Sequence, residues 1–144
     1  MALLLNKRNN IMKKLIILTL ILTQSIFADG LKTINAISDI PKNKNVVLIF
    51  SMQFCPYCIR QEKSILNKVQ PQFSDIEYLK VMRGTKVFQE LIETGNFGEV
   101  EYYPTTFILK VDQENQIDVK FPFKGFQKST NLINILNDKE IMAD

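Results

Sequence analysis

Two cysteines are the residues of this 144-residue chain best placed to do chemistry: Cys55 and Cys58, in the stretch SMQFCPYCIRQE. Two thiols this close can form a structural bridge, contribute to a metal site, or act as a redox couple. A bridge that closes so short a loop removes little entropy from the unfolded chain and would stabilise the fold weakly. The sequence has no histidine and no third cysteine, so a zinc site would need carboxylates or a second chain.

The redox couple is the interpretation with a positive mechanism. A thiol in the first turn of a helix meets unpaired backbone N-H groups and the positive end of the helix dipole, which both favour the thiolate. Pro56 suits an early helical position, because its missing N-H would be unpaired there anyway. We therefore expect Cys55 to attack a partner's disulfide as the nucleophile and Cys58 to resolve the mixed disulfide.

The cysteines are predicted to lie where a buried strand is followed by a helix. The apolar run at 46–50 is typical of a strand that is covered on both faces. From Pro56 onward the apolar residues recur at helical spacing, and the helix has to stop before Pro71. The residues expected on its apolar face are Ile59, Ile65, Leu66 and Val69.

The rest of the chain predicts an α/β domain with one mixed β-sheet flanked by helices. Leu31, Ile34 and Ile37 are spaced as in a short amphipathic helix over residues 31–40. The further predicted elements are a strand at 76–82, a helix from Gly84 and Thr85 to Gly95, a hairpin of strands 105–111 and 117–121, and a helix at 127–137. Pro122 makes the second hairpin strand an edge strand. The aromatic residues predicted in the core are Phe50, Phe73, Phe88, Phe107 and Phe121.

The first 28 residues read as a secretory signal. Two lysines precede an apolar run of 13 residues (15–27), which is too short to span a bilayer and is followed by Ala28. We expect cleavage after Ala28, with an uncleaved membrane anchor as the alternative and Met12 as an alternative start. This segment holds four of the 18 basic residues and none of the 15 acidic ones. Residues 29–144 therefore carry 14 basic and 15 acidic groups, which argues against nucleic-acid binding.

These features resemble the thioredoxin superfamily over about residues 31–138. The resemblance rests on the buried strand VVLIF, the motif FCPYC at a helix start, the dipeptide Tyr103-Pro104 before a strand, and Gly125 before the last helix. It implies a thioredoxin-like fold in which the Tyr103-Pro104 bond is cis and both residues line the substrate groove beside the disulfide. Phe54, Tyr57 and Tyr102 are expected in the same groove, next to Pro56.

Several departures from the family pattern refine the expected function. The Pro-Tyr pair between the cysteines is similar to glutaredoxin, whereas the leader and layout look more like exported periplasmic thioredoxin-like proteins. The family's buried aspartate, the proton acceptor for the second cysteine, is replaced here by Ile49. The family's strong oxidases have a histidine between their cysteines, and this chain has none. Arg60 and Lys63, on the helix after the cysteines, are expected to be solvated.

The sequence thus predicts an exported thiol-disulfide oxidoreductase that reduces rather than introduces disulfides. The expected partners are protein disulfides and dithiols, with a membrane thiol reductase as an electron donor. We expect a monomer with no bound cofactor or metal. The alternative is a binding protein on the same fold, or a Cu(I) carrier that uses the two thiolates. Such carriers usually separate their cysteines by three residues and add a histidine, and this chain offers only Met52 nearby.

Overall fold

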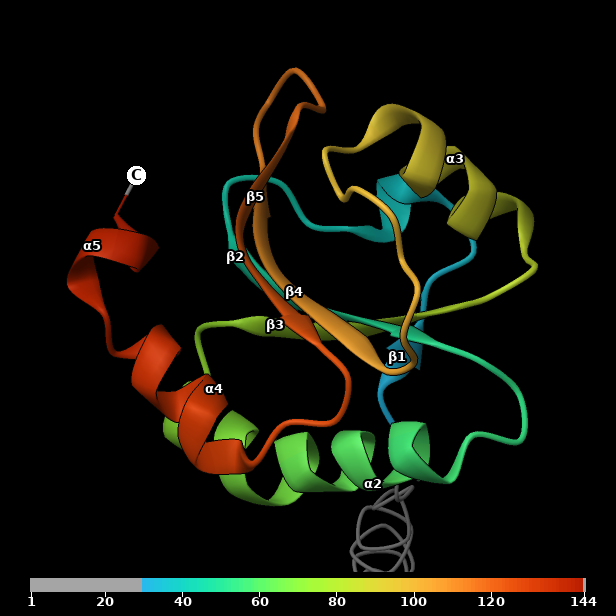
Figure 1. The fold of residues 1–144 in the computed structure, drawn as a ribbon. Coiled ribbons are helices and arrows are strands. Elements are labelled where there is room, and N and C mark those ends of the chain that lie inside the picture. The colour runs from blue at the N-terminus through green and yellow to red at the C-terminus, as the bar shows by residue number, and fades with distance from the viewer. Residues whose placement is uncertain (1–29, 144) are drawn as a thin grey trace, which may run out of the picture.

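The computed structural model describes residues 30–143, which form one mixed β-sheet with helices on both faces (Figure 1). The strand order is β1-β3-β2-β4-β5. The first three of these strands are mutually parallel, β4 is antiparallel to β2, and β5 is antiparallel to β4. The strands are β1 (Lys32–Thr33), β2 (Asn45–Ser51), β3 (Glu77–Met82), β4 (Thr105–Val111) and β5 (Ile117–Lys124). The predicted α/β architecture is confirmed.

Two layers of helices cover the sheet. In Figure 1, α2 and α4 lie on one side of it and α3 lies on the other, beside the short helix η1. The helix α2 continues into a wider π turn, η2, and then a 3-10 turn, η3. The helices are η1 (Ile37–Asp39), α2 (Pro56–Ser64), η2 (Ile65–Val69), η3 (Gln70–Gln72), α3 (Lys86–Thr94), α4 (Ser129–Leu136) and α5 (Lys139–Met142).

The central strand β2 supplies both hydrophobic cores of the domain. Val46, Leu48 and Phe50 point into the core under α3, and Val47 and Ile49 point into the core under α2 and α4. A strand covered on both faces needs apolar side chains at successive positions, which is the pattern that predicted it. The helices contribute Val87 and Leu91 to the first core, and Ile65, Val69, Leu132 and Leu136 to the second.

Several predicted boundaries are confirmed. α3 begins after Thr85, whose side-chain oxygen accepts a hydrogen bond from the backbone N-H of Phe88 at 3.3 Å, and it ends before Gly95. The hairpin of β4 and β5 forms, and Pro122 lies in β5 at the edge of the sheet. β5 is longer than predicted, because it continues past Pro122 to Lys124. The helix α5 was not predicted.

The amphipathic helix predicted over residues 31–40 is wrong. The segment is extended at Lys32–Thr33, where it pairs with β3, and turns into a single 3-10 helix at Ile37–Asp39. Leu31 is buried in the core under α2, whereas Ile34 is buried in the core under α3. A helix would have put both side chains on one side, so the pairing with β3 prevails over the helical spacing.

The predicted apolar face of α2 is only partly correct. Ile65 and Val69 are buried, but Ile59 has 54% of its surface exposed. The buried side chains of α2 and η2 are Cys58, Gln61, Ile65 and Val69, so the polar Gln61 belongs to the buried face and Ile59 does not.

The predicted core aromatics fall into two groups. Phe50 and Phe107 are fully buried, whereas Phe73, Phe88 and Phe121 are half-buried against the cores. The predicted signal at residues 1–28, with Met12 and the cleavage position, lies outside the described residues. Within residues 30–143, no helix combines the length and the apolar character needed to cross a bilayer.

Candidate redox site

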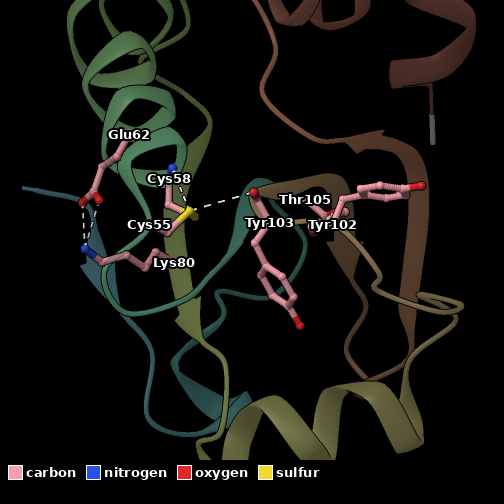
Figure 2. The surroundings of a disulfide bond; sticks show 7 residues. All are labelled: Cys55, Cys58, Glu62, Lys80, Tyr102, Tyr103 and Thr105. Atoms are coloured by element: carbon pink, nitrogen blue, oxygen red, sulfur yellow. Dashed lines mark hydrogen bonds and ion pairs between the residues drawn. A yellow bond between two sulfur atoms is a disulfide. The ribbon is translucent and has the colours of Figure 1, made fainter.

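Cys55 and Cys58 form a disulfide at the N-terminus of α2 (Figure 2). Their Cα atoms lie 5.2 Å apart. Cys55 is the N-cap residue, Pro56 follows in the first helical turn, and the backbone N-H of Cys58 donates to Cys55 Sγ at 3.1 Å. The sulfur of Cys55 therefore occupies the position of the oxygen in an ordinary helix cap. The cysteines thus lie between strand β2 and helix α2, as the sequence predicted.

Little surface of either cysteine is accessible: 5% of Cys55 and 2% of Cys58 are exposed. Cys55 lies at the very start of the helix, whereas Cys58 lies one turn inside it, under the first residues of α2. A partner's sulfur has to approach along the surface around Cys55, and this arrangement suits Cys55 as the attacked or attacking sulfur.

The loop before β4 closes the other side of the disulfide. The Tyr103-Pro104 bond is cis, as the family resemblance implied, and Pro104 is buried. The backbone oxygen of Tyr103 lies 3.9 Å from Cys55 Sγ. Once Cys55 is reduced, its thiol can donate a hydrogen bond to that oxygen. Thr105 fixes the loop from the next strand, because its hydroxyl donates to the backbone oxygen of Tyr102 at 2.6 Å.

Two of the aromatic side chains expected beside the disulfide, Tyr103 and Tyr57, pack against different aromatic residues. Figure 2 shows that the ring of Tyr103 points away from the disulfide. That ring packs against the ring of Phe88 in α3, with 6.5 Å between the ring centroids. Tyr57 lies on the helix side, with its ring 6.4 Å from that of Phe126 before α4. Phe54 is 97% exposed and has a positive φ of 55°, which non-glycine residues rarely adopt.

Exposed apolar side chains lie beside the cysteines in the chain and beside the Tyr103-Pro104 loop. Phe54, Tyr57, Ile59 and Tyr102 are the large exposed hydrophobic side chains of the described residues. Three of them lie within four residues of a cysteine, and Tyr102 precedes the Tyr103-Pro104 loop. Clustered exposed apolar side chains mark an interaction surface more often than chance exposure. The pattern of the sequence did not single out Ile59 as a surface residue.

A carboxylate on α2, that of Glu62, was missed by the sequence reasoning. Ile49, at the position of the family's aspartate, is buried among apolar side chains. Glu62, one helical turn after Cys58, instead points to β3, where its carboxylate oxygens lie 2.8 and 3.1 Å from Lys80 Nζ. Glu62 also accepts a hydrogen bond from the backbone N-H of Leu31 at 2.5 Å. A lysine inside the apolar strand IEYLKVM was the signal that could have pointed to this pair.

Gln61 is the second residue that the sequence reasoning missed. It is fully buried, and its side-chain oxygen accepts a hydrogen bond from the backbone N-H of Gln127 at 2.6 Å. This bond joins α2 to the chain just before α4. It thereby positions the segment that carries Phe126 beside the first turns of α2.

The described residues contain no group of three or more His, Cys, Asp or Glu side chains arranged to hold a metal ion. With both sulfurs in a disulfide, the reaction open to this site is thiol-disulfide exchange.

No protein-family profile matches the sequence, and no curated protein is similar to it at a significant level. Solved structures are similar. An uncharacterized thioredoxin-like protein from Clostridium perfringens matches over 83% of this chain and 90% of its own, with 16% identity and a TM-score of 0.62.

Two thioredoxins are also similar in structure, over a smaller share of this chain. Thioredoxin f2 from Chlamydomonas reinhardtii covers 75% of this chain and 94% of its own, with 17% identity and a TM-score of 0.56. Oxidized mitochondrial thioredoxin 3 from Saccharomyces cerevisiae covers 72% and 91%, with 17% identity and a TM-score of 0.52. These similarities extend over 72–83% of the chain and show that it has a thioredoxin-like fold.

Proposed function

We propose that this protein is an exported thiol-disulfide oxidoreductase that exchanges disulfides with other proteins. The observation that carries the proposal is the position of Cys55 Sγ, which takes an N-H at the start of α2 and faces the backbone of Tyr103. The first feature stabilises a thiolate, and the second gives a partner's chain a backbone to lie against.

The exchange proceeds in two balanced steps. The Cys55 thiolate attacks one sulfur of the partner's disulfide, and the partner's other sulfur leaves as a thiolate. Cys58 then loses its proton and attacks Cys55 Sγ, which releases the partner as a dithiol and leaves the Cys55-Cys58 disulfide. Two electrons pass to the partner, and the reverse sequence returns them. A second dithiol protein has to supply these electrons, and a membrane thiol reductase is the donor that we propose.

Reduction is the proposed direction. The two residues between the cysteines, Pro56 and Tyr57, include no histidine that would stabilise the thiolate further and make the disulfide a strong oxidant. The equilibrium between the protein and glutathione buffers of known composition measures the reduction potential. A potential close to that of a reductant, near that of thioredoxin at roughly −270 mV, supports the proposal. A value above about −150 mV would assign the opposite direction.

Activity is tested with a protein disulfide and a limiting amount of dithiothreitol. The wild type should accelerate reduction of an insulin-type disulfide, and the Cys55→Ser variant should not. Equal rates for the two proteins would remove the enzymatic function.

Export is proposed from the leader sequence and is tested separately. Cell fractionation and N-terminal sequencing should recover, outside the cytoplasm, a protein that begins at Asp29. A full-length chain in the cytosol would contradict export and leave the exchange chemistry untouched.

A further inference from the structure

A second surface of the molecule carries a hollow lined by basic side chains. An open hollow of about 510 Å³ lies between the later part of α2 and the start of α4. Its volume is in the range of binding pockets. The residues that line it are Arg60, Lys63, Ser64, Asn67, Lys68, Phe126, Lys128, Ser129 and Thr130.

The charges around this hollow are all of one sign. Its lining holds Arg60, Lys63, Lys68 and Lys128 and not one acidic residue. Such a concentration is unexpected in a chain whose residues 29–144 are close to neutral. Within the described residues, the ion pairs join Glu62, Glu77 and Glu90 to other lysines. They therefore neutralise none of the four cations that line the hollow.

The start of α4 adds to the positive potential. Lys128 occupies the N-cap position and makes no side-chain cap, and Ser129 and Thr130 of the first turn line the hollow. The first N-H groups of a helix carry partial positive charge and can donate to an anion. The hydroxyls of Ser129 and Thr130 and the amide of Asn67 supply further donors.

Two side-chain contacts link the hollow to the redox site. The Arg60 guanidinium carbon lies 4.8 Å from the centroid of the Phe126 ring. The centroid of that ring lies 6.4 Å from the centroid of the Tyr57 ring. Tyr57 lies between the two cysteines. An occupant of the hollow would therefore extend along α2 from the disulfide, and the stack on Phe126 holds Arg60 in place before anything binds.

We propose that this hollow binds an acidic segment of the protein whose disulfide is exchanged at Cys55. The inference rests on the proposed function and adds a recognition element to it. From Tyr57 to Lys68 the helix advances by about 16 Å, at 1.5 Å per residue. An extended chain covers this distance with about five residues, at roughly 3.3 Å each. Aspartates or glutamates within about five residues of the partner's cysteine are thus the groups that the hollow selects.

The test uses three synthetic peptides that share one intramolecular disulfide. In two of them, five residues rich in Asp and Glu follow or precede the disulfide, and in the third both flanks are Ser, Asn and Gln. The second-order rate of reduction by the reduced wild-type protein is measured for each. One acidic peptide should react about tenfold faster than the neutral one, and sodium chloride should abolish the difference.

Two double variants with the same change of charge locate the effect. Lys63→Gln combined with Lys128→Gln should remove the advantage of the acidic peptide. Lys42→Gln combined with Lys139→Gln changes exposed lysines that do not line the hollow and should keep it. The neutral peptide reports the exchange chemistry alone and should react at one rate with all three proteins.

The outcomes separate the two proposals. If the wild type reduces no peptide, the proposed function fails and the inference fails with it. If the neutral peptide is reduced but neither acidic peptide is faster, or both double variants lose the advantage equally, only the inference fails. If inorganic phosphate at a few millimolar removes the advantage more strongly than chloride at equal ionic strength, the hollow is a site for a small anion, which also overturns the inference.

Discussion

Cys55 Sγ and the backbone oxygen of Tyr103 lie 3.9 Å apart, although 48 residues separate them in the chain. The two atoms come from the start of α2 and from the loop before β4, which meet only because β2 and β4 are neighbours in the sheet. The redox site is therefore a product of the tertiary fold, and disturbing the Tyr103 loop should affect exchange as much as changes near the cysteines.

Replacing Pro104 tests this relationship. Pro104 is buried directly after Tyr103, so Pro104→Ala loosens the packing that holds the Tyr103 backbone against Cys55. We expect the exchange rate to fall by about tenfold, the scale of a small misplacement of reacting groups, while the protein stays folded by circular dichroism. Pro122→Ala, at an exposed position of the edge strand, is the matched control and should exchange normally. Wild-type exchange in Pro104→Ala would remove the Tyr103 loop from the site.

Trapping distinguishes the roles of the two cysteines. With Cys58→Ser, attack by Cys55 continues but the mixed disulfide is not resolved, so covalent complexes with partner proteins should accumulate and dissolve on adding dithiothreitol. Cys55→Ser should trap nothing. Non-reducing gels followed by mass spectrometry identify the partners. If both variants trap partners equally, or neither does while the wild type leaves insulin-type disulfides intact, the binding-protein alternative replaces the enzyme.

The thiol of Cys55 is expected to ionise more readily than a free cysteine. In the disulfide form its sulfur lies 3.1 Å from the Cys58 N-H and 3.9 Å from the Tyr103 oxygen, so the stabilising donor is the nearer group. The pKa of the reduced Cys55 thiol should lie below the usual value of about 8.5. The pH dependence of alkylation by iodoacetamide, read by mass spectrometry, measures it. Cys58 in the Cys55→Ser protein should require higher pH, and equal profiles would refute the helix-terminus argument.

Glu62 should matter more for stability than a comparable surface glutamate. The side chains of Glu62 and Lys80 are only 14% and 20% exposed, whereas those of Glu77 and Lys44 are 38% and 43% exposed. Glu62→Gln leaves a partly buried ammonium without its counter-charge and should lower the free energy of unfolding by about 1.5–3 kcal/mol. Glu77→Gln should cost less than about 1 kcal/mol. Urea unfolding of both oxidised variants measures the difference, and equal losses would contradict it.

Tyr78 gives the domain a dependence on alkaline pH. Burial raises the pKa of its phenol above the usual value of 10.0, and the charge of Asp75 adds to this effect. The neutral phenol donates to the backbone oxygen of Phe73 at 2.9 Å. Because the folded-state pKa is raised, the contribution of Tyr78 is complete below pH 10 and declines as the pH rises above it.

Urea unfolding of the oxidised protein between pH 8 and pH 11 measures this decline. The Tyr78→Phe variant should lose less stability over that interval than the wild type does. Tyr102→Phe removes an exposed phenol and should follow the wild type. A parallel decline in all three proteins would assign the alkaline sensitivity to other groups.

The parts of the fold that could be predicted from sequence are those with a local cause. The strand at 46–50 could be predicted because both of its faces are covered, which requires a continuous apolar run. The bounds of α3 could be predicted because Thr85 caps its start and Gly95 follows its end. The redox role of the cysteine pair could be predicted for the same reason. The two cysteines and the helix start that stabilises the thiolate are neighbours in the chain.

The sequence-based predictions are wrong where a residue distant in the chain determines the local structure. β1 is extended because it pairs with β3, whose residues lie some 47 positions later, and the spacing of Leu31 and Ile34 contains no trace of that partner. Gln61 is buried because the backbone of Gln127 needs an acceptor, and a hydrophobic pattern counts glutamine as a surface residue. The ion pair of Glu62 with Lys80 joins a helix to a strand, and the lysine within an apolar strand signals it without identifying its partner.

Both edges of the sheet are poor templates for a further strand. On one side β1 is only two residues long. On the other side β5 carries Pro122, which has no N-H to offer, and its pairing with β4 is irregular near Ile108 and Leu109. Edges that are short, interrupted or bulged resist strand addition between molecules. Copies of this protein can therefore fold close to one another without joining edge to edge, and contacts between molecules are made by the side chains around the disulfide instead.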